Sequence, residues 1–200
     1  MIAIIDYDAG NMKSVEKAFQ YLNEDAVITR DRKAILEADR VVLPGVGAFG
    51  DAMERLHSYD LVETIQDAVK SGKPFLGICL GLQLLFDSSE ETPGVKGLGL
   101  LPGKILRIPA AEGLKIPHMG WNSITVNKNS RILKNIGSEL MYILFTHIML
   151  MRRTRVYFRI YRVRSKLDIA VEKDNVFATQ FHPEKSGETG MTILKNFIAL

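Results

Sequence analysis

Short apolar runs alternate with segments of helical periodicity over about the first ninety residues. Ile2 to Ile5 is a continuous apolar run, and Asn11 to Leu22 follows with apolar residues every three or four positions, which predicts a strand and then a helix. The same order repeats, with strands expected at 26–29, 40–43 and 75–78 and helices at 32–38, 53–69 and 80–86. This alternation predicts an α/β fold: a mostly parallel, doubly wound sheet with helices on both faces.

The second half of the chain is richer in turns and β signals. Glycines and prolines between residues 94 and 103 precede an expected strand at 104–108. Further strands are expected at 124–126 and 176–181, and a closing helix at 191–200. Because we find no internal repeat or linker, we expect residues 1–200 to form a single domain with added β elements in the second half.

The composition is typical of a soluble globular protein with one domain. With 200 residues, 46% hydrophobic and 24% charged, the chain is long enough for one substantial core. No apolar stretch reaches the roughly 20 residues that a membrane-spanning helix needs. The N-terminus reads as a buried strand and lacks the features of a signal peptide. We therefore expect a cytoplasmic protein without a membrane partner.

The chain contains a single cysteine, Cys79. One cysteine excludes an internal disulfide and cannot by itself build a cysteine-rich zinc site. We expect no metal and no cofactor, and whatever Cys79 does, it does as a thiol.

Cys79 lies between an apolar strand and an apolar helix, with Gly77 and Gly81 two residues to either side. This is the pattern of a nucleophile elbow, in which glycines permit a sharp turn that exposes the nucleophile. A helix N-terminus would favour the thiolate, and the backbone N–H of Leu80 could receive an oxyanion. On this segment alone, a small buried hydrophobic role for Cys79 is equally open.

His182 and Glu184 flank a proline at the end of a β-like run. In an extended segment a spacing of two puts both side chains on one side, so the carboxylate can orient the imidazole while the imidazole faces a thiol. An isolated His-Pro-Glu is more often a surface turn. Combined with the glycine-flanked cysteine, it favours a Cys79–His182–Glu184 triad.

These two motifs, residues 77–83 and 180–184, resemble those of the class I glutamine amidotransferases. Most members of that family carry Pro-Gly-Gly where this chain has Pro44-Gly45-Val46. The resemblance is strongest to one branch, the glutaminase subunits of imidazole glycerol phosphate synthase, and it extends over nearly the whole chain. Three further segments carry it: residues 43–50, 93–98 and 117–122.

The resemblance implies hydrolysis of L-glutamine to glutamate through a thioester on Cys79. The ammonia would pass, within a heterodimer, to a cyclase subunit with a (β/α)8 barrel (HisF type), which forms imidazole glycerol phosphate and an aminoimidazole carboxamide ribotide in histidine biosynthesis. By the same resemblance, Gln83 holds the substrate glutamine, and the Val46 and Gly47 backbone supplies the second oxyanion donor. His118 is expected at the subunit interface.

Two other functions stay open from the residues. One is the glutaminase subunit of another class I enzyme, such as an anthranilate or aminodeoxychorismate synthase, although the segments around Val46 and His118 argue against it. The other is a non-catalytic nucleic-acid-binding or regulatory protein on the same scaffold. It is suggested only by seven cations between Arg152 and Lys166, in a chain whose formal net charge is +3. We expect no nucleic-acid partner.

The chain departs from the family pattern from Tyr142 to Lys166. Relatives carry a segment resembling Tyr-Phe-Val-His-Ser-Tyr-Tyr where this chain reads Tyr142-Ile-Leu-Phe-Thr-His-Ile-Met. That octapeptide can be encoded by DNA which, after deletion of one base, translates as the family segment. Our hypothesis is a local reading-frame shift, restored before Leu167; a genuine basic insertion is the alternative. A shift in the expressed protein would make residues 143–166 pack badly against the sheet.

Overall fold

The computed structural model describes the whole first half of the chain and parts of the second. The described residues are 1–107, 118–124, 130–136, 140–146, 148–151, 160–163, 165–167 and 170–200. For the described residues among 118–124, 140–146, 148–151, 160–163 and 165–167, the description covers the backbone alone.

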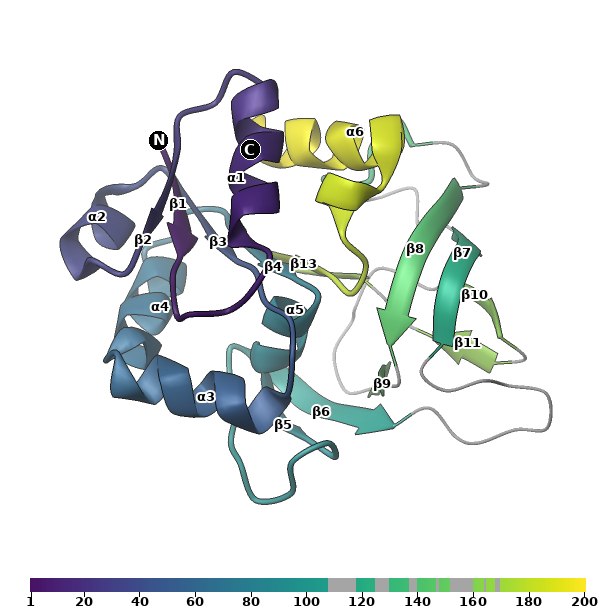
Figure 1. Ribbon diagram of the computed structural model, residues 1–200, viewed down its shortest axis with the longest axis horizontal. Helices are drawn as coiled ribbons and strands as arrows, with labels where there is room; N and C mark the ends of the chain where they lie inside the picture. Colours follow the sequence, from purple (N-terminus) through teal and green to yellow (C-terminus); the bar gives the residue numbers. More distant parts are fainter. Residues whose placement is uncertain are drawn as a thin grey trace.

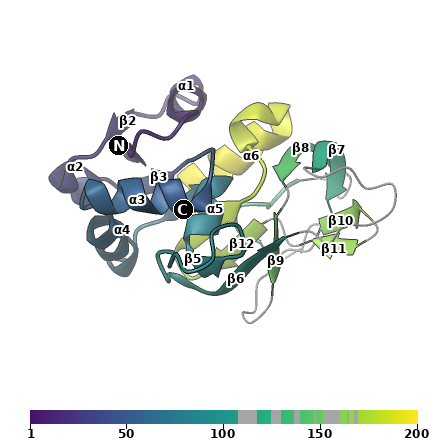
Figure 2. The same ribbon diagram turned by 60° about the horizontal axis from the view of Figure 1, so that its bottom comes forward.

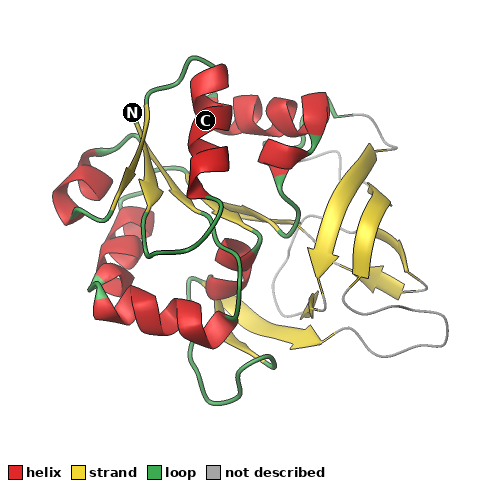
Figure 3. Ribbon diagram, viewed as in Figure 1, coloured by secondary structure: helices red, strands yellow, loops and turns green. Residues whose placement is uncertain are grey.

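A six-stranded sheet forms the centre of the fold (Figures 1 and 3). Its strand order is β12-β13-β4-β3-β1-β2, and only the edge strand β12 runs antiparallel to its neighbour. The strands are β1 (Ile2–Ile5), β2 (Ala26–Thr29), β3 (Arg40–Leu43), β4 (Phe75–Ile78), β12 (Ala170–Lys173) and β13 (Val176–Thr179). The mostly parallel sheet expected from the sequence is confirmed.

Helices cover both faces of the sheet because its strands are apolar on both sides. In β1, Ile2 and Ile4 pack into one core with α1 (Met12–Tyr21) and α6 (Gly187–Ile198). Ala3 and Ile5 pack into the opposite core, as expected for side chains that alternate along a strand. The helices of that second core are α2 (Arg32–Glu37), α3 (Phe49–Ser58), α4 (Leu61–Lys70) and α5 (Leu80–Leu84).

From Phe86 onward the chain adds smaller β elements beside the main sheet (Figures 1 and 2). One three-stranded sheet has the order β5-β6-β9, and two further pairs are β7–β8 and β10–β11. Their bounds are β5 (Phe86–Ser89), β6 (Leu101–Arg107), β7 (His118–Ile124), β8 (Leu140–Thr146), β9 (Ile148–Met151), β10 (Ile160–Val163) and β11 (Ser165–Leu167).

The expected helix at 53–69 is wrong: the chain forms two helices there, α3 and α4, with a break at Tyr59 and Asp60. Asp60 has a φ of 53°, and this left-handed conformation ends the helical path although the apolar periodicity continues. The sequence also missed the strands β5, β8, β9, β10, β11 and β12, and the helix expected at 80–86 ends at Leu84, because Phe86 begins β5. Of the expected strand at 124–126, Ile124 ends β7 and the other two residues lie outside the described part.

The side chains of residues 143–166, the region proposed to be read out of frame, lie outside the described part of the structure. The same holds for the arginine-rich window between Arg152 and Lys166. Within the part of the chain that the structure describes, no helix is both long and apolar enough to cross a membrane.

We predict that Phe197→Ala destabilises the protein by about 3–5 kcal/mol. Phe197 is fully buried on α6, and its ring lies 6.4 Å from that of Phe19 and 6.2 Å from that of Phe177, so truncation leaves a cavity between α1, α6 and the sheet. Chemical denaturation measures the loss. Gln20→Ala, at an exposed position of α1, is the control and should change the unfolding free energy by less than about 0.5 kcal/mol. Equal effects of the two substitutions would contradict this packing.

Candidate active site

Four loops meet at one edge of the central sheet. They follow β1, β3, β4 and β13, which are consecutive neighbours in the sheet and parallel to one another. Their carboxyl ends therefore open onto the same edge, where ligands bind in open α/β sheets. The residues gathered there are Asn11, the segment 44–48, Cys79, and the segment 180–184.

Cys79 occupies a sharp turn between β4 and α5. Its φ of 56° and ψ of −110° are unusual for a residue with a side chain, as the nucleophile-elbow pattern requires. The turn is fixed because the Cys79 N–H donates to the Thr179 carbonyl at 2.7 Å. Since α5 has only five residues, we assign little of the electrostatics at the sulfur to its dipole.

The flanking glycines are required by close backbone approach. A Cβ on Gly81 would lie 1.8 Å from the Leu43 carbonyl oxygen of β3, and one on Gly77 would lie 2.9 Å from the Gly81 carbonyl oxygen. Neither position has space for a side chain, so these glycines allow α5 to start directly against the sheet.

His182 and Glu184 form a contact beside this turn. The imidazole Nδ1 lies 2.7 Å from Glu184 Oε1, and both side chains are buried, with 7% and 0% of their surface exposed. The sequence predicted that an extended segment joins these two residues, but Glu184 lies in a short 3-10 turn, η1 (Pro183–Lys185). This turn brings the carboxylate to the imidazole. The Ser186 hydroxyl donates to the His182 carbonyl at 2.7 Å and closes this turn.

Asn11 is a member of this cluster that the sequence did not reveal. It lies at the start of α1 in a left-handed conformation with a φ of 77°. Its side-chain amide donates to Glu184 Oε1 at 2.5 Å and lies 3.3 Å from His182 Nδ1. Among the described residues, Glu184 Oε2 is buried without a hydrogen-bond partner. Thus the loop after β1 helps to hold the carboxylate against the imidazole.

The electrostatics of the cluster favour a charged imidazole. Burial by itself lowers the pKa of His182, but hydrogen bonds to Cys79 and Glu184 and the negative charge of both raise the pKa to about 9. Because Nδ1 faces Glu184, Nε2 is the nitrogen left for the sulfur. An imidazolium in that position stabilises the thiolate, which is the nucleophilic form of cysteine.

The loop after β3 lies beside the nucleophile. The Leu80 N–H, expected to receive an oxyanion, donates here to the Gly45 carbonyl at 3.3 Å. Val46 is 43% exposed, and Gly47 has a φ of 106°. In the described conformation the Leu80 N–H is already bonded to the Gly45 carbonyl. This carbonyl must therefore move aside before Leu80 can bind an oxyanion.

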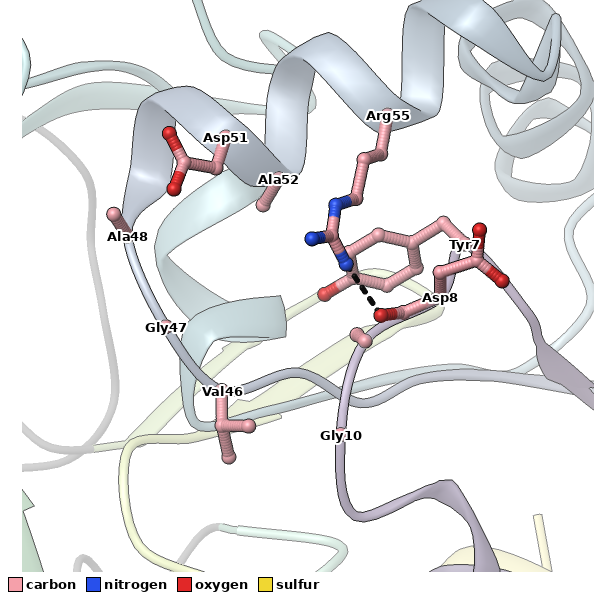
Figure 4. Close-up of a pocket in the computed structure, with 10 residues that line it drawn as sticks. Tyr7, Asp8, Gly10, Val46, Gly47, Ala48, Asp51, Ala52 and Arg55 are labelled. Carbon is pink, nitrogen blue, oxygen red and sulfur yellow. Dashed lines mark hydrogen bonds between the residues drawn. The ribbon is translucent and has the colours of Figure 1, made fainter.

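A small pocket lies next to this loop, lined by residues of the loops after β1 and β3 and of helix α3 (Figure 4). The Tyr7 hydroxyl donates to the Pro44 carbonyl at 2.8 Å, and the Arg55 guanidinium donates to the Asp8 carbonyl. Burial, together with the negative charge of Cys79, raises the pKa of Tyr7, so its hydroxyl keeps its proton. These bonds tie the two loops and α3 together around the pocket.

Two buried glutamines complete the site. Gln83, expected to hold the substrate, is 6% exposed, and its Nε2 donates to Gln180 Oε1 at 3.0 Å. Gln180, which the sequence did not single out although it belongs to the histidine motif, is 4% exposed. Its Nε2 lies 3.7 Å from Cys79 Sγ, within hydrogen-bonding range of sulfur.

The structure therefore brings Cys79, Leu80, Gln83, His182 and Glu184 together with the Val46–Gly47 loop. Over the described residues, no group of three or more histidine, cysteine, aspartate or glutamate side chains is arranged to hold a metal ion. The side chain of His118, expected at an interface, lies outside the described part.

Comparisons with known proteins find one family, the class I glutamine amidotransferases. A family model described as glutamine amidotransferase class-I matches residues 3–200. The chain is 47% identical to the imidazole glycerol phosphate synthase subunit HisH of Methanothermobacter thermautotrophicus, covering 100% of this chain and 98% of that protein. It is 43% identical to the HisH subunit of Methanocaldococcus jannaschii, covering 100% of both.

Solved structures share the fold at low sequence identity. A crystal structure of a glutamine amidotransferase superposes with a TM-score of 0.78 at 17% identity, covering 100% of this chain and 98% of the other. The structure of PurLQS from Thermotoga maritima gives a TM-score of 0.72 at 21% identity, covering 99% and 97%.

We predict that Gly81→Ala disrupts the turn at Cys79. The new methyl group would collide with the Leu43 carbonyl, so we expect a loss of about 1–3 kcal/mol in unfolding free energy and slower alkylation of Cys79. Gly72→Ala is the control, because Gly72 also has a positive φ, of 84°, but faces open space. It should cost some stability while leaving alkylation unchanged; an alkylation rate in Gly81→Ala equal to wild type would contradict the close approach.

The raised pKa of His182 also predicts a pH dependence of stability. A folded-state pKa of about 9, above the ordinary histidine value of 6.5, contributes stability that is fully present below pH 6.5 and is lost as the pH rises through 9. The difference in unfolding free energy between wild type and His182→Asn should therefore shrink over this range. Denaturation at several pH values tests this, with exposed His57→Asn as the control. A difference that stays constant would exclude the raised pKa.

Proposed function

Since the chain belongs to the class I glutamine amidotransferases, in the branch of the imidazole glycerol phosphate synthase subunit HisH, we propose that Cys79, His182 and Glu184 are its catalytic triad. The chain is the glutaminase subunit of that synthase and hydrolyses L-glutamine. The observation that carries the assignment of residues is the buried His182–Glu184 contact at 2.7 Å, beside a cysteine whose interaction with the imidazole helps to raise the pKa of His182.

The geometry supports a two-step reaction. The Cys79 thiolate attacks the side-chain amide carbon of glutamine, and the imidazolium of His182 gives its Nε2 proton to the departing ammonia. The resulting glutamyl thioester is then attacked by a water molecule, whose proton passes to the neutral imidazole. As the C–S bond breaks, the electron pair returns to sulfur and glutamate leaves. Glu184 holds the imidazole in the required tautomer throughout.

The oxyanion of each tetrahedral intermediate needs backbone donors. We assign these to the Leu80 N–H and to the Val46–Gly47 peptide. Because the Leu80 N–H is bonded to the Gly45 carbonyl, the loop must first rearrange. The exposure of Val46 supports this assignment, since an exposed loop can shift without disturbing the core.

The ammonia is used by a cyclase subunit of the same synthase. We propose that this partner is a (β/α)8 barrel that forms a heterodimer with the chain, and that it uses the ammonia to form imidazole glycerol phosphate and the aminoimidazole carboxamide ribotide. The names of the relatives favour this synthase over anthranilate or aminodeoxychorismate synthase. No described residue favours the nucleic-acid-binding alternative, whose arginines lie outside the described side chains.

We further infer that residues 1–200 act as one amidotransferase domain and that the protein works in the cytoplasm. The first inference is supported by the family match over residues 3–200. The second is supported by the mechanism, which needs Cys79 as a free thiol and therefore suits a reducing compartment.

Glutamate release, measured with and without the cyclase subunit, tests the triad. We expect the cyclase to stimulate the wild type, Cys79→Ala to abolish activity, and Glu184→Gln to lower kcat by about 100-fold or more, because the imidazole loses its orienting charge. Glu188→Gln makes the same chemical change at an exposed position of α6 and should leave kcat unchanged. Activity in Cys79→Ala, or equal kcat values for the two glutamate variants, would refute the assignment.

A further inference from the structure

Cys79 has a second polar neighbour besides His182. The Gln180 side chain places Nε2 at 3.7 Å from Cys79 Sγ, in the geometry of a hydrogen bond to sulfur. We propose that Gln180 is an additional catalytic residue, whose amide N–H donates a hydrogen bond to the thiolate and stabilises its negative charge. This proposal deepens the function proposed above and rests on it for the role of the thiolate in glutamine hydrolysis.

The orientation of the Gln180 amide is set by Gln83. The Gln83 Nε2 donates to Gln180 Oε1 at 3.0 Å, which leaves the nitrogen end of the Gln180 amide to face the sulfur. Both side chains are buried, so water does not compete for these groups and the amide has little freedom to turn. Gln83 comes from α5 and Gln180 follows β13, so the pair also ties together the two segments that flank the sulfur.

This orientation suits the charged form of the sulfur. A thiolate is only an acceptor, and the amide N–H is only a donor, so the contact is favourable when Cys79 has lost its proton. When the C–S bond of the thioester breaks, the electron pair returns to sulfur, and the Gln180 N–H is already placed to donate a hydrogen bond to the thiolate that forms. In the second step His182 acts as the base toward water. The Gln180 amide, which does not titrate, can therefore serve separately as the hydrogen-bond donor to sulfur.

Alkylation of Cys79 tests this role without glutamine. Because Cys79 is the single cysteine of the chain, iodoacetamide incorporation reports on this sulfur alone. In Gln180→Met, a residue of similar length without a donor, we expect the rate at neutral pH to fall about 3- to 10-fold and the pH profile to move to higher pH. In Gln180→Glu the shift should be larger, because a carboxylate would face the sulfur. Gln83→Met should give a smaller shift in the same direction.

Gln66→Met is the matched control, since the Gln66 amide donates to the Leu98 carbonyl away from the site. Its alkylation profile should coincide with that of wild type. Unfolding midpoints of all variants show whether each is folded, and Gln180→Glu keeps the shape of the native side chain if the methionine variant is unstable. Profiles of Gln180→Met and Gln180→Glu that coincide with wild type would overturn the proposal. If the variants show these shifts but the wild type releases no glutamate with the cyclase, the proposed function is refuted instead.

Discussion

The sharp reversal of the chain at Cys79 is the constraint on which the site depends. Helix α5 starts so close to β3 that Gly81 has no room for a Cβ beside the Leu43 carbonyl. The sulfur is consequently held at the carboxyl edge of the sheet, in a backbone conformation that a cysteine would not adopt unaided. Since β13 and β3 flank β4, the loops that follow these strands are delivered to either side of the sulfur.

Two side-chain networks then converge on that sulfur from distant parts of the chain. One consists of His182, Glu184 and Asn11, and it keeps the imidazole charged and oriented. The other consists of Gln83 and Gln180, and it turns an amide N–H toward the sulfur. The glutaminase reaction needs both a proton donor and a stable thiolate, and in the mechanism proposed above each network supplies one of them. The occupied Leu80 N–H leaves the oxyanion site as the part that still has to be assembled.

Much of the fold could be predicted because parallel strands buried on both faces are continuous apolar runs, as Ile2–Ile5 and Phe75–Ile78 are. The break between α3 and α4 could not, because a single left-handed residue, Asp60, interrupts an otherwise unbroken periodicity. The triad residues stand in recognisable local motifs. Asn11 contacts Glu184, which is 173 positions away in the sequence, and Gln180 contacts Cys79, which is 101 positions away. A local sequence pattern does not predict contacts between residues so far apart in the chain.

The central claim is that Cys79 becomes covalently attached to the substrate with the help of His182. Acid quenching of the reaction with isotopically labelled glutamine, followed by peptide mass spectrometry, measures this most directly. The account predicts a labelled glutamyl group on the Cys79 peptide of the wild type in complex with the cyclase, and a much lower amount in His182→Asn. Label on a different residue, or turnover without label on any residue, would contradict it.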